Sequence, residues 1–276
     1  MTSGINIGSY SSYGNAYVRF ICKVKDNSLA AGLNQLVNWA NVTVEDEVYK
    51  DDASVLVEKN SETPILPDVN NTQQVINQDY DWGPERETFT MESPATYPAF
   101  NSILNNPTIG DERDFVRIGE ITPERTELSD SVELSVGKRY LVYIYYHNNA
   151  SATYNLEKYS NAGVSLNTRL ATFFPTSVDN EHPGVVSATI TSDNAIPSSV
   201  WDAARMVVSS DEKVYLHYEE GSARIYNDGK TNGESLPTDL FLHKGALLGY
   251  DELNGMVPGC EQYHGVVSYV IQALGE

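Results

Sequence analysis

The chain has 276 residues, of which 41% are hydrophobic, and its 38 acidic and 18 basic side chains give a net charge of −20. That hydrophobic content is typical of chains that fold around a core, whereas the negative charge would repel a phosphate backbone, so we expect no nucleic-acid partner. No window approaches the roughly 18 uninterrupted apolar residues of a membrane-spanning helix, so we expect no membrane insertion of this segment.

The first elements predicted along the chain are a strand and a hairpin. Apolar residues alternate over 18–24, which predicts a strand with Cys22 as a buried free thiol. Alternation over 41–57 predicts a hairpin, and the run LAAGLNQL at 29–36 could form a short helix before it. Residues 1–59 hold too few strands for an independent core, so we expect them to pack on another unit.

The clearest boundary follows this hairpin. Two prolines lie in a polar run over 58–74, and proline cannot donate to a sheet ladder and favours extended backbone. We therefore expect a linker over 60–76 between residues 1–59 and a larger module over 77–276.

Period-two alternation continues through the larger module. Half-buried strands are predicted over 132–136, 163–170, 185–190 and 214–218. The run YLVYIYY at 140–146 is apolar on both faces, which predicts a central strand in the middle of the larger module. Glycine-containing turns punctuate these runs, and no segment shows a long amphipathic stripe. The sequence therefore predicts an all-β fold, an Ig-like antiparallel β-sandwich with little helix.

The chain ends much as it begins. GINIGSY precedes VRFICKV near the start, and GALLGY at 245–250 precedes VSYVIQA near the end. In both places a Gly-x-x-x-Gly turn leads into a strand, and the matched positions are Val18, Phe20 and Ile21 with Val267, Tyr269 and Val270. A tandem array of related units would repeat such pieces.

Two stretches carry a family resemblance. With a glycine-rich turn at Gly8 and strand-like runs at 18–24, 38–44 and 52–57, residues 1–59 resemble the closing half of the DUF11-type conserved repeat of bacterial cell-surface proteins. The remainder looks like an Ig-like module associated with such repeats, through phrases such as NPTIGDERDFV, GKRYLVYIYYHNNAS and GALLGYDELNGMVPGCEQYHGVVSY. The resemblance implies placement and architecture and supplies no catalytic residue set.

The resemblance implies a non-enzymatic structural or stalk module that is extracellular, on the cell surface or in the cell wall. If residues 1–59 are the tail of a repeat, their open strand edges could pair with neighbouring copies, giving assembly by strand complementation. The alternative is an adhesin or carbohydrate-binding module whose surface loops grip a glycan or a host surface protein. A lysine-to-asparagine isopeptide crosslink of the kind some surface sandwiches use also stays open.

The nucleophiles and histidines form no recognisable catalytic set. The five histidines are scattered and are interpreted as surface or packing residues; they are His147, His182, His217, His243 and His264. Cys260 has His264 four residues on, but its acidic surroundings offer no cation to stabilise a thiolate. The chain has no Cys-x-x-Cys motif and no cysteine–histidine cluster, so we expect no structural zinc site, no catalytic residues and no cofactor.

Acidic residues are numerous, so their clusters predict little by themselves. We interpret DERD at 111–114 as a solvated turn. Asp79, Asp81 and Glu85 have the oxygen-ligand spacing of a calcium site without the order of an EF-hand loop, which leaves calcium as an open alternative. Trp201, in SSVWDAA, is the candidate exposed ring for stacking on a sugar, although the preferred interpretation of the many aromatic residues is that they are strand and sandwich-rim residues.

Overall fold

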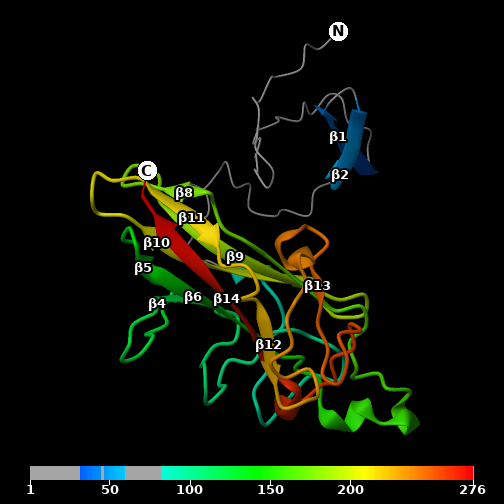
Figure 1. Cartoon of the computed structure of the whole chain (residues 1–276). Coiled ribbons are helices and arrows are strands. Elements are labelled where there is room, and N and C mark those ends of the chain that lie inside the picture. Colours follow the sequence, from blue (N-terminus) through cyan, green and yellow to red (C-terminus); the bar gives the residue numbers. More distant parts are fainter. Residues whose placement is uncertain (1–31, 45–46, 60–81, 276) are drawn as a thin grey trace. The chain divides into compact units, whose positions relative to one another are not determined.

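A computed structural model describes residues 32–44, 47–59 and 82–275 of the chain (Figure 1). The chain divides into two compact units, 1–66 and 67–276. The described residues form strands, loops and short 3-10 turns without an α-helix, so the all-β prediction is confirmed. The expected linker over 60–76 and the opening strand with Cys22 lie outside the described residues.

Unit 1 contributes one long hairpin. Strand β1 (Gly32–Val44) pairs antiparallel with β2 (Glu47–Lys59), from Gly32 opposite Lys59 to Val44 opposite Glu47. The hairpin predicted over 41–57 is therefore confirmed. The short helix considered for 29–36 is wrong over 32–36, because those residues already belong to β1. A helix of so few residues is marginal on its own, and the ladder to β2 satisfies the same backbone groups.

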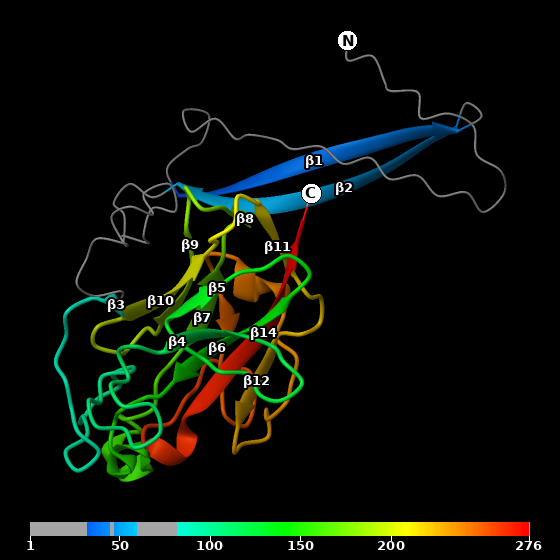
Figure 2. The ribbon, with the colours of Figure 1, turned by 90° about the vertical axis from the view of Figure 1, so that its left-hand side faces the viewer.

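Unit 2 contains two six-stranded sheets (Figures 1 and 2). The first has the order β13-β7-β9-β10-β3, and β5 also pairs with β10. All its pairings are antiparallel except that of β5 with β10. Its strands are β3 (Trp82–Gly83), β5 (Ser131–Glu133), β7 (Arg169–Phe173), β9 (Gly184–Thr191), β10 (Ser199–Val207) and β13 (Ala246–Leu247).

The second sheet is antiparallel throughout and has the order β4-β6-β14-β11-β8, with β12 also on β14. Its strands are β4 (Val116–Glu120), β6 (Arg139–Tyr146), β8 (Ser177–Val178), β11 (Val214–Tyr218), β12 (Arg224–Asn227) and β14 (Gly265–Leu274). The 3-10 turns are η2 (Ala152–Asn155), η3 (Glu157–Tyr159), η4 (Thr238–Phe241) and η5 (Glu261–Tyr263). Two sheets around one core are consistent with a β-sandwich.

The core lies between the two sheets and draws on both. Tyr140, Val142 and Ile144 of β6 are fully buried, and the residues on its other face are buried or half-buried. The run 140–146 predicted a central strand; β6 is interior but second in its sheet, and β14 occupies the middle position. A hydrogen bond joins the sheets inside the core, because the hydroxyl groups of Thr172 in β7 and Tyr269 in β14 lie 2.8 Å apart.

The other strand predictions have mixed outcomes. The runs 185–190 and 214–218 lie in β9 and β11, as predicted. Only the start of 132–136 lies in β5, and most of 163–170 is a turn before β7. The reason for this turn is local: the hydroxyl groups of Ser165 and Thr168 lie 2.7 Å apart, and Asn167 has a positive φ of 49°.

Strand β10 departs from simple alternation because Asp202 lies at its centre. This buried carboxylate accepts hydrogen bonds from the backbone N–H groups of Phe115 (2.5 Å) and Val116 (2.6 Å), where β4 begins. Asp202 therefore ties one sheet to the other. Burial raises the pKa of its carboxyl well above the ordinary value, although the N–H group of Val116 opposes the shift.

This raised pKa predicts a pH-dependent stability. The folded chain retains the Asp202 proton where the unfolded chain has lost it, so the contribution is complete below the ordinary pKa and is lost as the pH rises through the folded pKa. The variant Asp202→Asn keeps an acceptor oxygen but cannot ionise. Above pH ~4, the unfolding free energy of this variant minus that of the wild type should increase by up to about 1.4 kcal/mol per pH unit.

Urea unfolding of both proteins across the acidic to neutral range measures this difference. The exposed Asp228→Asn is the matched control and should track the wild type at every pH. A difference between Asp202→Asn and the wild type that does not change with pH would contradict the assignment.

Candidate functional site

The candidate site begins where β6 ends. Its last residues, Tyr145 and Tyr146, lead directly into His147, Asn148 and Asn149, and all five are almost fully buried. A buried polar group without a partner costs free energy, so these side chains should be hydrogen-bonded. Each of the three polar residues contacts a different part of the chain, which makes this segment the junction of several loops.

Glu112 is the most enclosed charged residue of the site, with 0% of its surface exposed. Its Oε1 atom accepts a hydrogen bond from the side-chain amide of Asn106 at 2.7 Å, and its Oε2 atom accepts one from Asn149 at 2.7 Å. The Tyr145 hydroxyl lies 3.4 Å from Oε1. Several donors thus compensate for the loss of water around this carboxylate.

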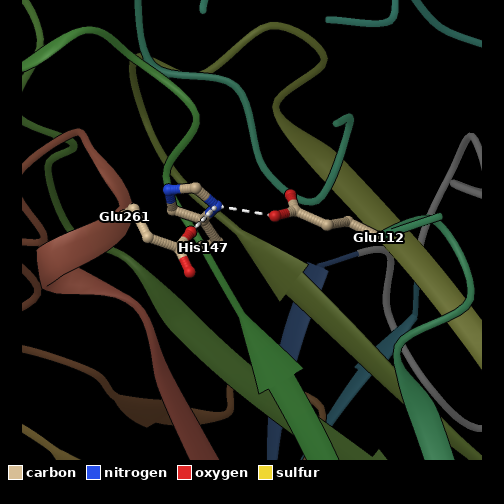
Figure 3. Close-up of side chains that lie close together, drawn as sticks. All are labelled: Glu112, His147 and Glu261. Atoms are coloured by element: carbon tan, nitrogen blue, oxygen red, sulfur yellow. Dashed lines mark hydrogen bonds and ion pairs between the residues drawn. The ribbon is translucent and has the colours of Figure 1, made fainter. Parts of the chain in front are cut away.

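His147 lies between two glutamates (Figure 3). Its Nδ1 atom is 2.7 Å from Oε1 of Glu112 and 3.6 Å from Oε2 of Glu261. The ring is 1% exposed, and its Nε2 atom has no hydrogen-bond partner among the described residues. The polar contacts of the His147 ring are therefore made by Nδ1, on the side that faces the carboxylates.

Asn148 joins the loops on the other side of the segment. Its side-chain amide donates to the backbone carbonyl oxygens of Gly163 and Val257, both at 2.8 Å. The backbone carbonyl oxygen of Asn148 accepts a hydrogen bond from the N–H group of Cys260 at 3.0 Å. A Cβ atom at Gly259 would lie 2.5 Å from the Ala150 carbonyl oxygen. Glycine is therefore needed for the loop before η5 to come this close.

Two aromatic rings border the site. The Tyr145 ring centroid lies 5.4 Å from that of His264 and 6.2 Å from that of His147. Burial raises the pKa of the Tyr145 hydroxyl above its ordinary value, and the negative charges of Glu112 and Glu261 raise it further. This hydroxyl therefore stays protonated and serves as a hydrogen-bond donor at neutral pH.

Of the sequence-predicted binding and calcium residues, the structure describes Trp201 and Glu85. Trp201 is half-buried in β10, and its indole packs over Gly83, where an added Cβ atom would lie 2.8 Å from the ring. Glu85 is exposed, whereas Asp79 and Asp81 lie outside the described residues.

The cysteine, histidine and lysine candidates lie as follows. Cys260 is a half-buried free thiol, and the Nδ1 atom of His264 contacts the Glu261 carbonyl oxygen. The remaining histidines, His182, His217 and His243, are exposed. The lysines within 82–275 are also exposed, so that part of the chain offers no buried lysine for an isopeptide crosslink.

One interpretation of the acidic clusters is wrong. DERD at 111–114 is not simply a solvated turn, because Glu112 within it is fully enclosed by donors from 106, 145, 147 and 149. The sequence did contain one signal: three polar residues, His-Asn-Asn, follow at once on an apolar strand, with neither glycine nor proline to turn the chain outward. Sequence reasoning nevertheless missed the grouping of Glu112, His147 and Glu261.

Comparisons of the chain with family models, with curated proteins and with solved structures gave no match. Within the region that the structure describes, no helix has the length and apolar character to cross a membrane.

Asn148 offers a test of the loop junction. The variant Asn148→Ala leaves the buried carbonyl oxygens of Gly163 and Val257 without this donor, so it should lower the unfolding free energy by about 3 kcal/mol. Asn180→Ala, which removes an exposed amide, is the control and should change it by less than about 0.5 kcal/mol. Equal unfolding free energies for the two variants in urea would contradict the role of Asn148.

Proposed function

We propose that this chain is a non-enzymatic structural module of an extracellular or cell-surface bacterial repeat protein, with unit 2 acting as an Ig-like spacer. The observation that supports this most directly is the buried segment 147–149, which fixes loops from four parts of the chain by hydrogen bonds instead of leaving them free. Loops held in this way make the end of a sandwich rigid, which suits a spacer. The resemblance of residues 1–59 to the DUF11-type repeat supports the same placement.

The strand edges favour assembly through unit 1. In unit 2 the ordered paths of the sheets end at β13, β3, β8 and β4. The first three have two residues each, and short edge strands discourage pairing with another chain. The fourth, β4, has five residues and carries a bridge between Ile118 and Ser129. Among the described residues, β1 and β2 pair only with each other over 13 positions. A long two-stranded sheet is marginal alone and gains from a further strand. A neighbouring copy is the partner that we propose.

Assembly can be tested on the full chain. Sedimentation velocity over increasing concentration should reveal species larger than the monomer. The double variant Val42→Pro with Val55→Pro removes ladder donors from both strands and should remain monomeric. The matched pair Val42→Ala with Val55→Ala keeps the donors and should assemble like the wild type. A wild type that is monomeric throughout, or a proline variant that assembles equally, would refute strand complementation.

A second candidate function is carbohydrate binding. A surface hollow of about 430 Å³ is lined by polar residues together with Phe89, Tyr97 and Leu104. The rings of Phe89 and Tyr97 meet edge to face at 6.2 Å, and the Tyr97 hydroxyl donates to Glu87 at 2.6 Å. An aromatic surface beside fixed polar groups is the usual chemistry of a sugar site, which favours an adhesin as the alternative.

Glycan-array binding separates this candidate from a simple spacer. If the hollow binds a sugar, Tyr97→Ala should weaken binding by about tenfold, since loss of one stacking ring costs roughly 1.4 kcal/mol. Trp201→Ala is the comparison, because that ring already packs over Gly83 and should matter less. Absence of any bound glycan, or equal losses in both variants, would count against the hollow.

A further inference from the structure

The strongest unassigned feature of the chain is the group formed by Glu112, His147 and Glu261. One ligand atom from each residue lies within 4.8 Å of the other two (Figure 3). We propose that these three side chains bind a divalent first-row transition-metal ion, with Zn²⁺ as the reference ion. The ligands are Oε1 of Glu112, Nδ1 of His147 and Oε2 of Glu261.

The spacing of the three atoms suits such an ion. With metal–ligand bonds of about 2.1 Å and tetrahedral angles, neighbouring ligand atoms lie about 3.4 Å apart. The Nδ1 atom of His147 and Oε2 of Glu261 are 3.6 Å apart, close to that value. Nδ1 and Oε1 of Glu112 are 2.7 Å apart, so Glu112 needs to withdraw by about 0.7 Å when the ion replaces the hydrogen bond.

An unpaired buried atom marks the same place. The Oε2 atom of Glu261 is shielded from solvent and has no hydrogen-bond partner among the described residues, and its separation from Nδ1 exceeds a hydrogen bond. Such an atom in a folded protein calls for a partner, and an ion between it and the imidazole supplies one. This observation is independent of the mere clustering of acidic groups.

The donor set selects the class of ion. Ca²⁺ and Mg²⁺ take oxygen ligands, whereas an imidazole nitrogen with carboxylate oxygens suits Zn²⁺, Mn²⁺ or Fe²⁺. Two carboxylates beside a neutral imidazole leave two negative charges, which a divalent ion balances. Glu261 is 31% exposed while the other two ligands are enclosed, so the ion enters from the side of η5.

Neighbouring side chains hold the ligands in place. The amide of Asn149 donates to Oε2 of Glu112, and that of Asn106 donates to Oε1, both at 2.7 Å. Hydrogen bonds of this kind orient metal ligands and tune their affinity. The bound ion would join the loop before β4, the end of β6 and the turn before β14, three segments far apart in the chain. It would therefore serve to stabilise this end of unit 2.

Titration of the full, chelator-treated chain with Zn²⁺ tests the proposal. Isothermal titration calorimetry should show one equivalent bound, and the melting temperature should rise with Zn²⁺ but not with Ca²⁺. Glu261→Gln preserves shape at the partly exposed ligand and should weaken Zn²⁺ binding by at least about tenfold. His147→Gln should do the same, and Co²⁺ in the wild type should give visible absorption typical of a tetrahedral site.

Two controls separate the site from other Zn²⁺ ligands. The exposed Glu252→Gln and the thiol variant Cys260→Ser should bind Zn²⁺ as the wild type does. Loss of binding in Cys260→Ser alone would move the ion to the cysteine and overturn the proposal. So would absence of Zn²⁺ binding, or unchanged affinity in Glu261→Gln.

Discussion

The need to satisfy buried polar groups governs unit 2. Strand β6 contributes core residues as far as Tyr146, where it ends. The chain then continues, still buried, with His147, Asn148 and Asn149. An unpaired polar group at this depth would cost a few kcal/mol. Hydrogen bonds from this segment hold the loops at 101, 112, 163 and 257. Asn101 illustrates the principle, because its side chain bonds the backbone on either side of Tyr146, at the Tyr145 carbonyl and the His147 N–H group.

The same requirement explains how Glu112 and His147 are accommodated beyond the end of β6. Glu112 is tolerated without water because Asn106, Asn149 and His147 converge on it, and each of them is fixed by other contacts. Removing one partner of such a network costs more than the network contributes as a whole. A rigid polar cluster can hold loops for a spacer and can hold an ion, so the proposed metal site and the proposed structural role need the same chemistry.

Sequence reasoning succeeds where a local pattern reports burial and fails where burial depends on distant partners. Alternation over 185–190 and the two apolar faces of 140–146 identified β9 and β6, because the sheet pleat repeats every two residues. Strand β10 was not predicted, because it contains the charged residue Asp202. The N–H groups that donate to Asp202 come from the start of β4, almost ninety residues away. Glu112 resembled any acidic turn residue for the same reason. No neighbouring residue in the sequence indicates that donors from 145–149 surround Glu112.

The position of β14 has a mechanical consequence. It is an interior strand, flanked by β6 along one side and by β11 and β12 along the other, and it runs away from η5 toward the opposite end of unit 2 (Figures 1 and 2). Its ladder with β6 extends from Gly265 opposite Tyr146 to Gln272 opposite Arg139. Tension applied along β14 would load these hydrogen bonds in shear, all at once, instead of unzipping them singly. A fold in which the last strand is central would therefore resist pulling through that strand.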